Sequence, residues 1–109
     1  MTMPKCRKGK ISENRAGRRY ERAGYNVKLR RKFRFGEVDL IAKRGRERIA
    51  AEIKHGNKSR TIPASEVRKI ARKAGYLKAK PVMILSGKAE LSSNARKIAR
   101  KLGVRVKKI

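Results

Sequence analysis

The chain has 109 residues, of which 34 are Lys or Arg and only 8 are Asp or Glu, so its formal net charge is +26. A chain of this length is expected to form a single domain, and we expect neither a membrane span nor a signal peptide because no apolar run is long enough. The single cysteine, Cys6, excludes an intrachain disulfide and a cysteine metal cluster.

The charge predicts a polyanionic partner. Nucleic acid is the expected one, because Lys and Arg displace the counterions condensed on phosphates. An anionic membrane surface is the alternative, but no predicted amphipathic helix carries large apolar residues opposite its basic face. We therefore expect an intracellular, cytoplasmic protein that is associated with the nucleoid and binds no membrane. The absence of glutamine favours a thermophilic source.

The elements are predicted in chain order from helical and strand spacing. Residues 1–10 are expected to form a flexible basic arm, and residues 11–109 a single domain. The first helix should begin at its N-cap, Ser12, and end before Gly24. The other expected elements are a strand at 26–31, a basic aromatic connector at 32–36, strands at 37–43 and 48–54, a polar loop at 55–63, a helix at 65–74 stopped by Gly75, a strand at 82–85, a helix at 93–102 stopped by Gly103, and a strand at 104–106.

This order, α-β-β-β-α-β-α-β, predicts an α/β fold with a mixed β-sheet flanked by helices. The middle strands should form an antiparallel hairpin that turns at Gly45 and Arg46, and the later strands alternate with helices, as in parallel crossover units. The segment RKIARK occurs at 68–73 and again at 96–101. It indicates two similar helices whose apolar faces cover the sheet, and this packing is compatible with contacts between their basic faces and nucleic acid.

The predicted hairpin places Asp39, the only aspartate of the chain, opposite Glu52. Paired residues on an antiparallel sheet have Cβ atoms about 4.5–5.5 Å apart, so the two carboxylates would repel each other. A cation between them would reverse the sign of that energy, and Mg²⁺ prefers oxygen ligands. A hairpin with an ordinary solvated polar face is the alternative. The opposite face of the two strands is expected to be core, with Val38, Leu40, Ala42, Ile49, Ala51 and Ile53.

Other residues carry candidate roles with alternatives. Glu13 shares a helical face with positions 16, 17 and 20 and should point toward the sheet; alternatively, it is an acid that favours the first helical turn. His55 should point away from the carboxylates and be a structural or surface residue. Phe33 and Phe35 lie among basic residues, where they either stack on bases or belong to the core.

The pattern of Asp39 followed by EIK at 52–54 resembles the signature of the PD-(D/E)XK nucleases. KGKISE at 8–13, GYNV at 24–27 and VDLIA at 38–42 occur at spacings similar to those of archaeal Holliday junction resolvases. RFGEVDLIA at 34–42 is also similar to small bacterial predicted endonucleases related to them. The resemblance covers Lys8 to about Leu85 and implies a restriction-endonuclease-like fold.

The resemblance also implies the catalytic residues Glu13, Asp39, Glu52 and Lys54. Asp39, Glu52 and the backbone carbonyl of Ile53 would ligate Mg²⁺, or Mn²⁺, and Glu13 would support the metal through water. Lys54 would orient or deprotonate the attacking water and stabilise the charged phosphorane. The chemistry calls for such a set, since a metal lowers the pKa of bound water and a lysine supplies positive charge where negative charge develops.

The expected function is a Mg²⁺-dependent endonuclease of DNA repair or recombination, with branched or four-way junction DNA as the candidate substrate and a homodimer as the assembly. A non-catalytic basic binder, ribosomal or chromatin-like, and an RNA nuclease on the same fold are the alternatives. The residues expected to contact nucleic acid are Lys8, Lys10, Arg30, Arg31, Lys32, Arg34, Lys58, Arg60, Arg68, Lys69, Arg72 and Lys73.

Overall fold

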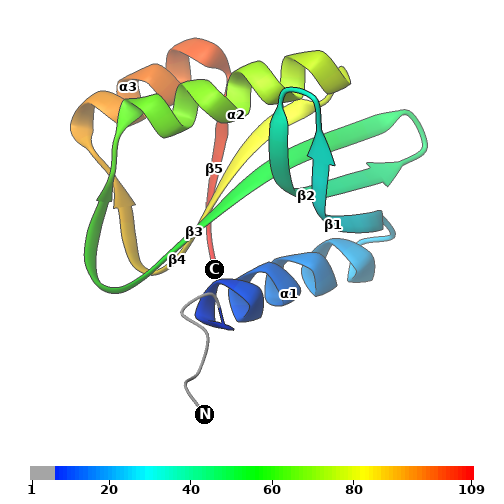
Figure 1. The fold of residues 1–109 in the computed structure, drawn as a ribbon, viewed down its shortest axis with the longest axis horizontal. Helices are drawn as coiled ribbons and strands as arrows, with labels where there is room; N and C mark the ends of the chain where they lie inside the picture. Colours follow the sequence, from blue (N-terminus) through cyan, green and yellow to red (C-terminus); the bar gives the residue numbers. More distant parts are fainter. Residues whose placement is uncertain (1–6) are drawn as a thin grey trace.

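The computed structural model describes residues 7–109, with side chains from residue 11 onward. Helices and strands follow one another in the predicted order (Figure 1). They are α1 (Arg7–Arg22), β1 (Asn26–Phe33), β2 (Gly36–Arg44), β3 (Glu47–Ile62), α2 (Ala64–Leu77), β4 (Lys80–Leu91), α3 (Ser93–Leu102) and β5 (Arg105–Lys108).

The strands form one mixed sheet whose spatial order, β1-β2-β3-β4-β5, is also the order along the chain. The pairs β1–β2 and β2–β3 are antiparallel, whereas β3–β4 and β4–β5 are parallel. In Figure 1, α1 covers one face of the sheet and α2 and α3 cover the other. The predicted α/β fold, a mixed sheet flanked by helices, is confirmed.

Each face of the sheet has its own apolar core. Beneath α1, Ala16 and Tyr20 pack on strand residues that include Leu40 and Ile53. Beneath α2 and α3 the core is larger, and burying one of its aliphatic side chains completely is worth about 1.5–3 kcal/mol. The helical residues of that core are Ala64, Val67, Ile70, Ala74, Ala95 and Ala99.

The central hairpin has the predicted register. Leu40 pairs with Ala51 and Ile41 pairs with Ala50, so the strands turn at Gly45 and Arg46. Gly45 has a φ of 59°, a left-handed conformation that glycine adopts without the steric cost of a Cβ. The register therefore brings Asp39 and Glu52 to the point where the two strands separate.

One predicted face was wrong at Val38. Residues two apart on a regular strand share a face, so Val38 and Leu40 were expected to lie in the same core. Val38 instead lies in the core beneath α2 and α3, whereas Leu40 lies in the core beneath α1. The physical reason is an irregularity around Asp39. The β2–β3 ladder ends at Leu40, and Arg30, which would pair with Asp39 on β1, has a φ of 50°. Asp39 is therefore not held in the regular alternation of β2.

Residues 55–63, expected to be a polar loop, mostly continue β3. The strand runs to Ile62 because it pairs in parallel with β4, through His55 with Ser86 and Ile62 with Leu91. The register shifts between Gly56 and Arg60, which marks a bulge. The polar residues of this segment are mostly exposed, so strand pairing rather than side-chain burial defines this part of β3.

Two helix limits also differ from the prediction. Helix α1 begins at Arg7, so Ser12 is not an N-cap but a buried residue inside the helix; residues 1–6 of the expected arm lie outside the described part of the chain. Helix α2 passes through Gly75 and ends at Leu77, and Lys78 takes the left-handed C-cap conformation. None of the helices within residues 7–109 is long and apolar enough to cross a membrane.

Candidate active site

Asp39 is tied to the start of the EIK segment by its carboxylate. The backbone N–H of Ile53 donates to Oδ2 of Asp39 at 2.9 Å, beyond the last backbone pair of the β2–β3 ladder, Leu40 with Ala51. The Asp39 side chain thus satisfies a strand N–H where β2 no longer pairs with β3. This bond fixes the carboxylate beside Glu52, the residue before Ile53.

Glu52 and Asp39 form a coupled pair of acids. Burial, and then the charge of Asp39 and a hydrogen bond to it, raise the pKa of Glu52 from its ordinary value of 4.5 to about 8, while the charges of Lys54 and Lys73 act in the opposite direction. Desolvation and a neighbouring like charge both disfavour the ionised carboxyl. The raised pKa of Glu52 therefore favours its protonated, neutral form at neutral pH.

Lys54 lies between two acids. Its Nζ is 3.6 Å from Oε1 of Glu52 and 3.5 Å from Oε2 of Glu66, and 17% of its side chain is exposed. The structure therefore brings Lys54 to the acid pair, as the sequence predicted. Glu66 was not predicted. Glu66 lies in the first turn of α2, where acidic residues are common because they interact favourably with the helix N-terminus. Its sequence position therefore gave no sign of a contact with a residue on β3.

Lys73 reaches the same site from α2. Its Nζ donates to the backbone carbonyl of Glu37 at 2.6 Å, and its charge lowers the pKa of Glu52. The sequence placed Lys73 among the phosphate contacts without relating it to the acids. The Lys73 ammonium is therefore a cation at the rim of the acid pair. Its side chain is partly buried, and the carbonyl of Glu37 holds its position.

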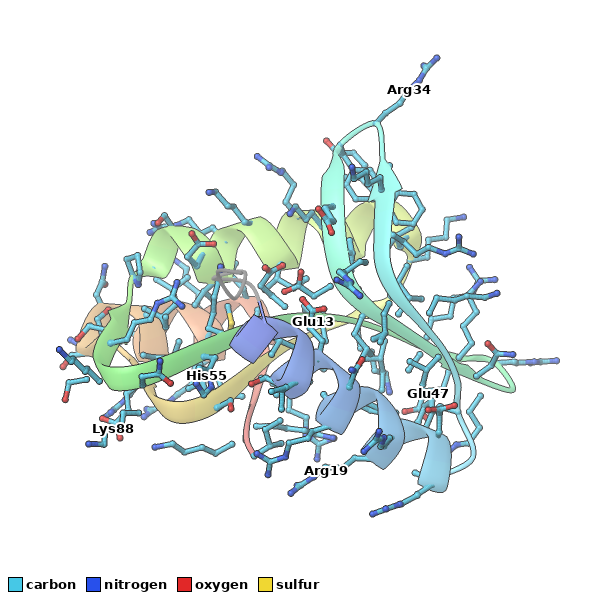
Figure 2. All side chains as sticks on the ribbon, turned by 60° about the horizontal axis from the view of Figure 1, so that its bottom comes forward. Glu13, Arg19, Arg34, Glu47, His55 and Lys88 are labelled. Carbon is cyan, nitrogen blue, oxygen red and sulfur yellow. The ribbon has the colours of Figure 1, made fainter. Side chains whose placement is uncertain are left out.

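Glu13 points toward the sheet from α1, as predicted, and there it contacts Arg30. Its Oε2 is 3.3 Å from Nε of Arg30, and 14% of its side chain is exposed (Figure 2). Within residues 7–109, no group of three or more His, Cys, Asp or Glu is arranged to hold a metal ion. The structure thus brings Asp39 and Glu52 together and pairs Glu13 with a cation; a role of Glu13 in metal binding stays a prediction.

The predicted phosphate contacts are spread over α1, the β1–β2 hairpin, β3 and α2. Arg34 extends from the tip of the β1–β2 hairpin (Figure 2), Lys69 pairs with Glu66 at 3.7 Å, and Arg60 donates to the carbonyl of His55 at 2.8 Å. Lys8 and Lys10 belong to α1, but their side chains lie outside the described part. The other exposed members of the set are Arg30, Arg31, Lys32, Lys58, Arg68 and Arg72.

His55, expected to be a structural or surface residue, belongs to a polar cluster beneath α1. Its Nδ1 is 2.9 Å from Oγ of Ser86 and 3.3 Å from Oγ of Ser12, and its Nε2 is 2.9 Å from Oδ1 of Asn57. Ser12 also donates to Ser86 at 3.0 Å. The cluster satisfies the polar side chains that α1 buries against β3 and β4, so Ser12 has a packing role instead of a capping one.

Comparison with family models gives no match for this chain. A curated UPF0102 protein from Kosmotoga olearia is 36% identical over 52 residues, which make up 47% of this chain and 45% of the relative. The chain therefore covers less than half the length of this relative.

Solved structures share the fold at low identity. The protein of unknown function AF1548 has a TM-score of 0.76 and 19% identity, over 88% of this chain and 55% of that one. A repair endonuclease from Pyrococcus abyssi has a TM-score of 0.68 and 15% identity, over 100% of this chain and 48% of that one. EndoMS in complex with double-stranded DNA has a TM-score of 0.56 and 19% identity, over 78% of this chain and 36% of that one. The chain therefore shares its fold with repair endonucleases of known structure, and the sequence resemblance implied such a fold.

Proposed function

We propose that this chain is a metal-dependent endonuclease that hydrolyses DNA phosphodiester bonds at the centre formed by Asp39, Glu52 and Lys54. The observation that carries the proposal is the pair of acids, Asp39 and Glu52, in a chain with a formal net charge of +26. A protein that only bound phosphates would be weakened by two adjoining carboxyl groups, because they repel phosphate and resist desolvation. The nuclease-like fold and the structure of EndoMS with double-stranded DNA support the choice of DNA.

The donor set fits a hard divalent cation. Two neighbouring carboxyl groups offer oxygen ligands whose mutual repulsion a divalent ion would remove. Asp39, Glu52 and the backbone carbonyl of Ile53 would hold Mg²⁺ or Mn²⁺, with Glu13 acting through water. Bound there, the metal would lower the pKa of a water molecule and neutralise the scissile phosphate.

The cations of the chain itself would position and stabilise the substrate. Lys54 is held between Glu52 and Glu66, and in the proposed reaction its ammonium would orient the water that attacks the phosphate and stabilise the negative charge that develops. Lys73, at the rim of the acid pair, would contact a phosphate oxygen next to the one that reacts. The surrounding Arg and Lys side chains would bind the phosphates on either side.

Branched or four-way junction DNA is the substrate that we propose from the resemblance to resolvases. A symmetric homodimer would place two equivalent centres on such a substrate, one for each of two cuts. Both parts can be tested together, because the mass of the protein–DNA complex gives the number of subunits and the product lengths give the positions of the cuts.

The proposal is tested by incubating the purified chain with labelled duplex, single-stranded, flap and four-way DNA, each with Mg²⁺, Mn²⁺ or EDTA. We expect products with either metal and none with EDTA. Glu90→Gln is the matched control, because Glu90 is an exposed acid paired with Lys108 and its loss should leave cleavage unchanged. Tight binding of every DNA without cleavage in either metal would identify a non-catalytic binder instead.

A further inference from the structure

Three aromatic rings form a stack between the β1–β2 hairpin and α2. The rings of Phe33 and Phe35 have centroids 5.0 Å apart and planes 6° apart, and Phe35 lies 5.0 Å from Tyr76 at 21°. Phe33 is 37% exposed and Tyr76 is 64% exposed. Phe35 lies between the other two rings and packs against the core beneath α2 and α3, so it joins the hairpin tip to α2.

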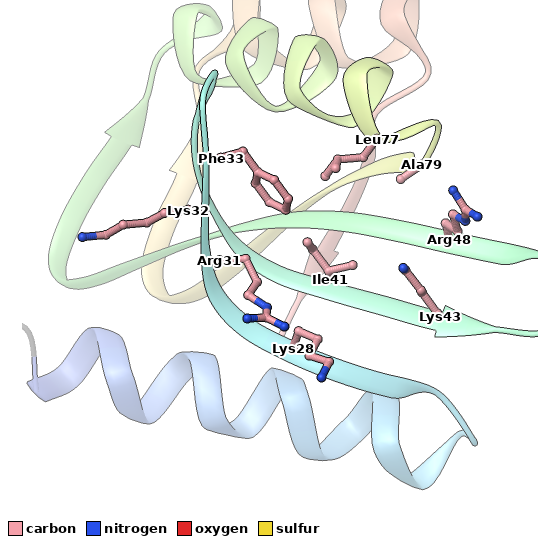
Figure 3. A pocket seen from close by; sticks show the side chains of 9 residues that line it. All are labelled: Lys28, Arg31, Lys32, Phe33, Ile41, Lys43, Arg48, Leu77 and Ala79. Carbon is pink, nitrogen blue, oxygen red and sulfur yellow. The ribbon is translucent and has the colours of Figure 1, made fainter.

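Phe33 forms one wall of a pocket of about 310 Å³ (Figure 3). The apolar part of the pocket consists of Phe33 and Ile41 from the hairpin and of Leu77 and Ala79 from the end of α2 and the residues after it. Phe35 and Tyr76 do not line it, so Phe33 is the member of the aromatic stack that meets the pocket. The volume is at the lower end of the range of small-ligand sites, about 300–1,000 Å³, which suits one nucleoside and is too small for a base pair.

The rim of this pocket is cationic. Among the residues described by the structure, those that line the pocket include no acid. An apolar floor with an aromatic wall suits the face of a base, and Arg and Lys around it suit the phosphates of the strand that carries the base. The basic lining residues, all exposed, are Lys28, Arg31, Lys32, Lys43 and Arg48.

We infer that this pocket binds one unpaired nucleotide of the DNA strand, with its base stacked on Phe33 and its phosphates against the basic rim. The inference rests on the proposed function and deepens it, because it requires an unpaired nucleotide beside the cut. A base within an intact duplex is covered on both faces by its neighbours, so it cannot stack on Phe33 unless it leaves the helix.

The pocket lies next to the acid pair along β2. Ile41, on the pocket floor, is two residues from Asp39 on the same strand, so the two backbone positions are at most about 7 Å apart, the reach of an extended chain. A DNA strand whose phosphate lies at Asp39 and Glu52 therefore has a neighbouring nucleotide within reach of Phe33. Single-stranded, flap or branched DNA supplies such a nucleotide without the cost of unstacking a duplex.

The test measures binding in EDTA, where no cleavage can take place. A single-stranded oligonucleotide of 12 residues with 2-aminopurine at its centre is titrated with the native protein, and a duplex of the same sequence serves as the comparison. We expect 2-aminopurine fluorescence to be quenched on binding of the single strand. Phe33→Leu should abolish the quenching and weaken single-strand binding by about 5- to 100-fold, the range for a lost base–aromatic stack, while changing duplex affinity less than twofold. Phe33→Tyr should retain the quenching and the single-strand affinity of the native protein.

Leu102→Ala is the matched control, since Leu102 is an exposed apolar residue of α3 far along the chain from the pocket residues. It should leave both affinities unchanged. An unquenched single strand with the native protein, or an equal loss of single-strand and duplex affinity in Phe33→Leu, would overturn the inference. Competition by dTMP as strong as that by the oligonucleotide would also overturn it, because the ligand would then be a free nucleotide. Failure of metal-dependent cleavage alone would reject the nuclease and leave this binding result standing.

Discussion

Oδ2 of Asp39 accepts a hydrogen bond of 2.9 Å from the backbone N–H of Ile53. This bond lies just beyond the end of the β2–β3 ladder. The carboxylate that we assign to the metal therefore also satisfies a backbone N–H that β2 leaves unpaired on β3. Asp39→Ala should therefore lower the free energy of unfolding by about 1–3 kcal/mol, the cost of an unsatisfied buried N–H group. Asp39→Asn should cost much less because the amide oxygen can still accept the bond. Urea denaturation in EDTA measures the difference, and equal stability of the two variants would contradict this role.

Lys54 should act on the rate of cleavage more than on DNA binding. Lys54→Ala should lower the single-turnover rate by about 10²–10⁴, the usual range for a positioned proton-transfer group. Lys54→Arg should restore phosphate attraction but not proton transfer, since a guanidinium does not deprotonate in this pH range. A full rate in the arginine variant would reduce Lys54 to an electrostatic role, and a loss of affinity at an unchanged rate would make it a simple phosphate contact.

Glu66 should position Lys54. Glu66→Gln removes one of the two acids that hold the ammonium, and we expect the single-turnover rate to fall by about 2- to 5-fold, as for the loss of a partly exposed ion pair. The effect should disappear in the Lys54→Ala background, because Glu66 has no other proposed part in the reaction. A double-mutant cycle measures this coupling. Additive losses in the double variant would show that Glu66 acts independently of Lys54.

The raised pKa of Glu52 predicts how stability depends on pH in the metal-free protein. Because burial and Asp39 raise this pKa from 4.5 to about 8, the folded state binds more protons than the unfolded state between these values. The stabilisation from this proton is complete below about pH 4.5 and is lost as the pH rises through about 8. In EDTA, the native protein should lose stability relative to Glu52→Gln over this window, and Mg²⁺ should reverse the loss. Parallel stability curves for the two proteins would contradict the raised pKa of Glu52.

The sequence was sufficient to predict the hairpin and the acids on it. A two-residue turn at Gly45 and Arg46 sets the pairing of the two strands, and this register puts Asp39 and Glu52 just beyond the last backbone pair, Leu40 with Ala51. The face of Val38 could not be predicted in the same way, because strand alternation assumes an unbroken ladder and the ladder ends at Leu40.

The other differences have a common physical origin in partners distant along the chain. The second half of β3 has few buried side chains, so no apolar pattern marks it, and it is a strand because β4 lies beside it. Ser12 has the sequence context of an N-cap, but in the folded protein its side chain contacts His55 and Ser86, which are distant along the chain. Likewise, nothing near Glu66 in the sequence indicates that Lys54, from another element, lies 3.5 Å away.

The most direct test of the proposed centre is the single-turnover cleavage rate of Asp39→Asn in Mg²⁺, measured beside its DNA affinity. The variant keeps an acceptor for the N–H of Ile53 and removes one charge from the acid pair, so it should stay folded and bind DNA at least as tightly as the native chain. We predict a cleavage rate lower by about 10³-fold or more, because the metal supplies several kcal/mol of charge stabilisation. Glu52→Gln should show the same loss of cleavage rate with DNA binding retained. Cleavage by Asp39→Asn within threefold of the native rate would contradict the assignment of these acids as the metal centre.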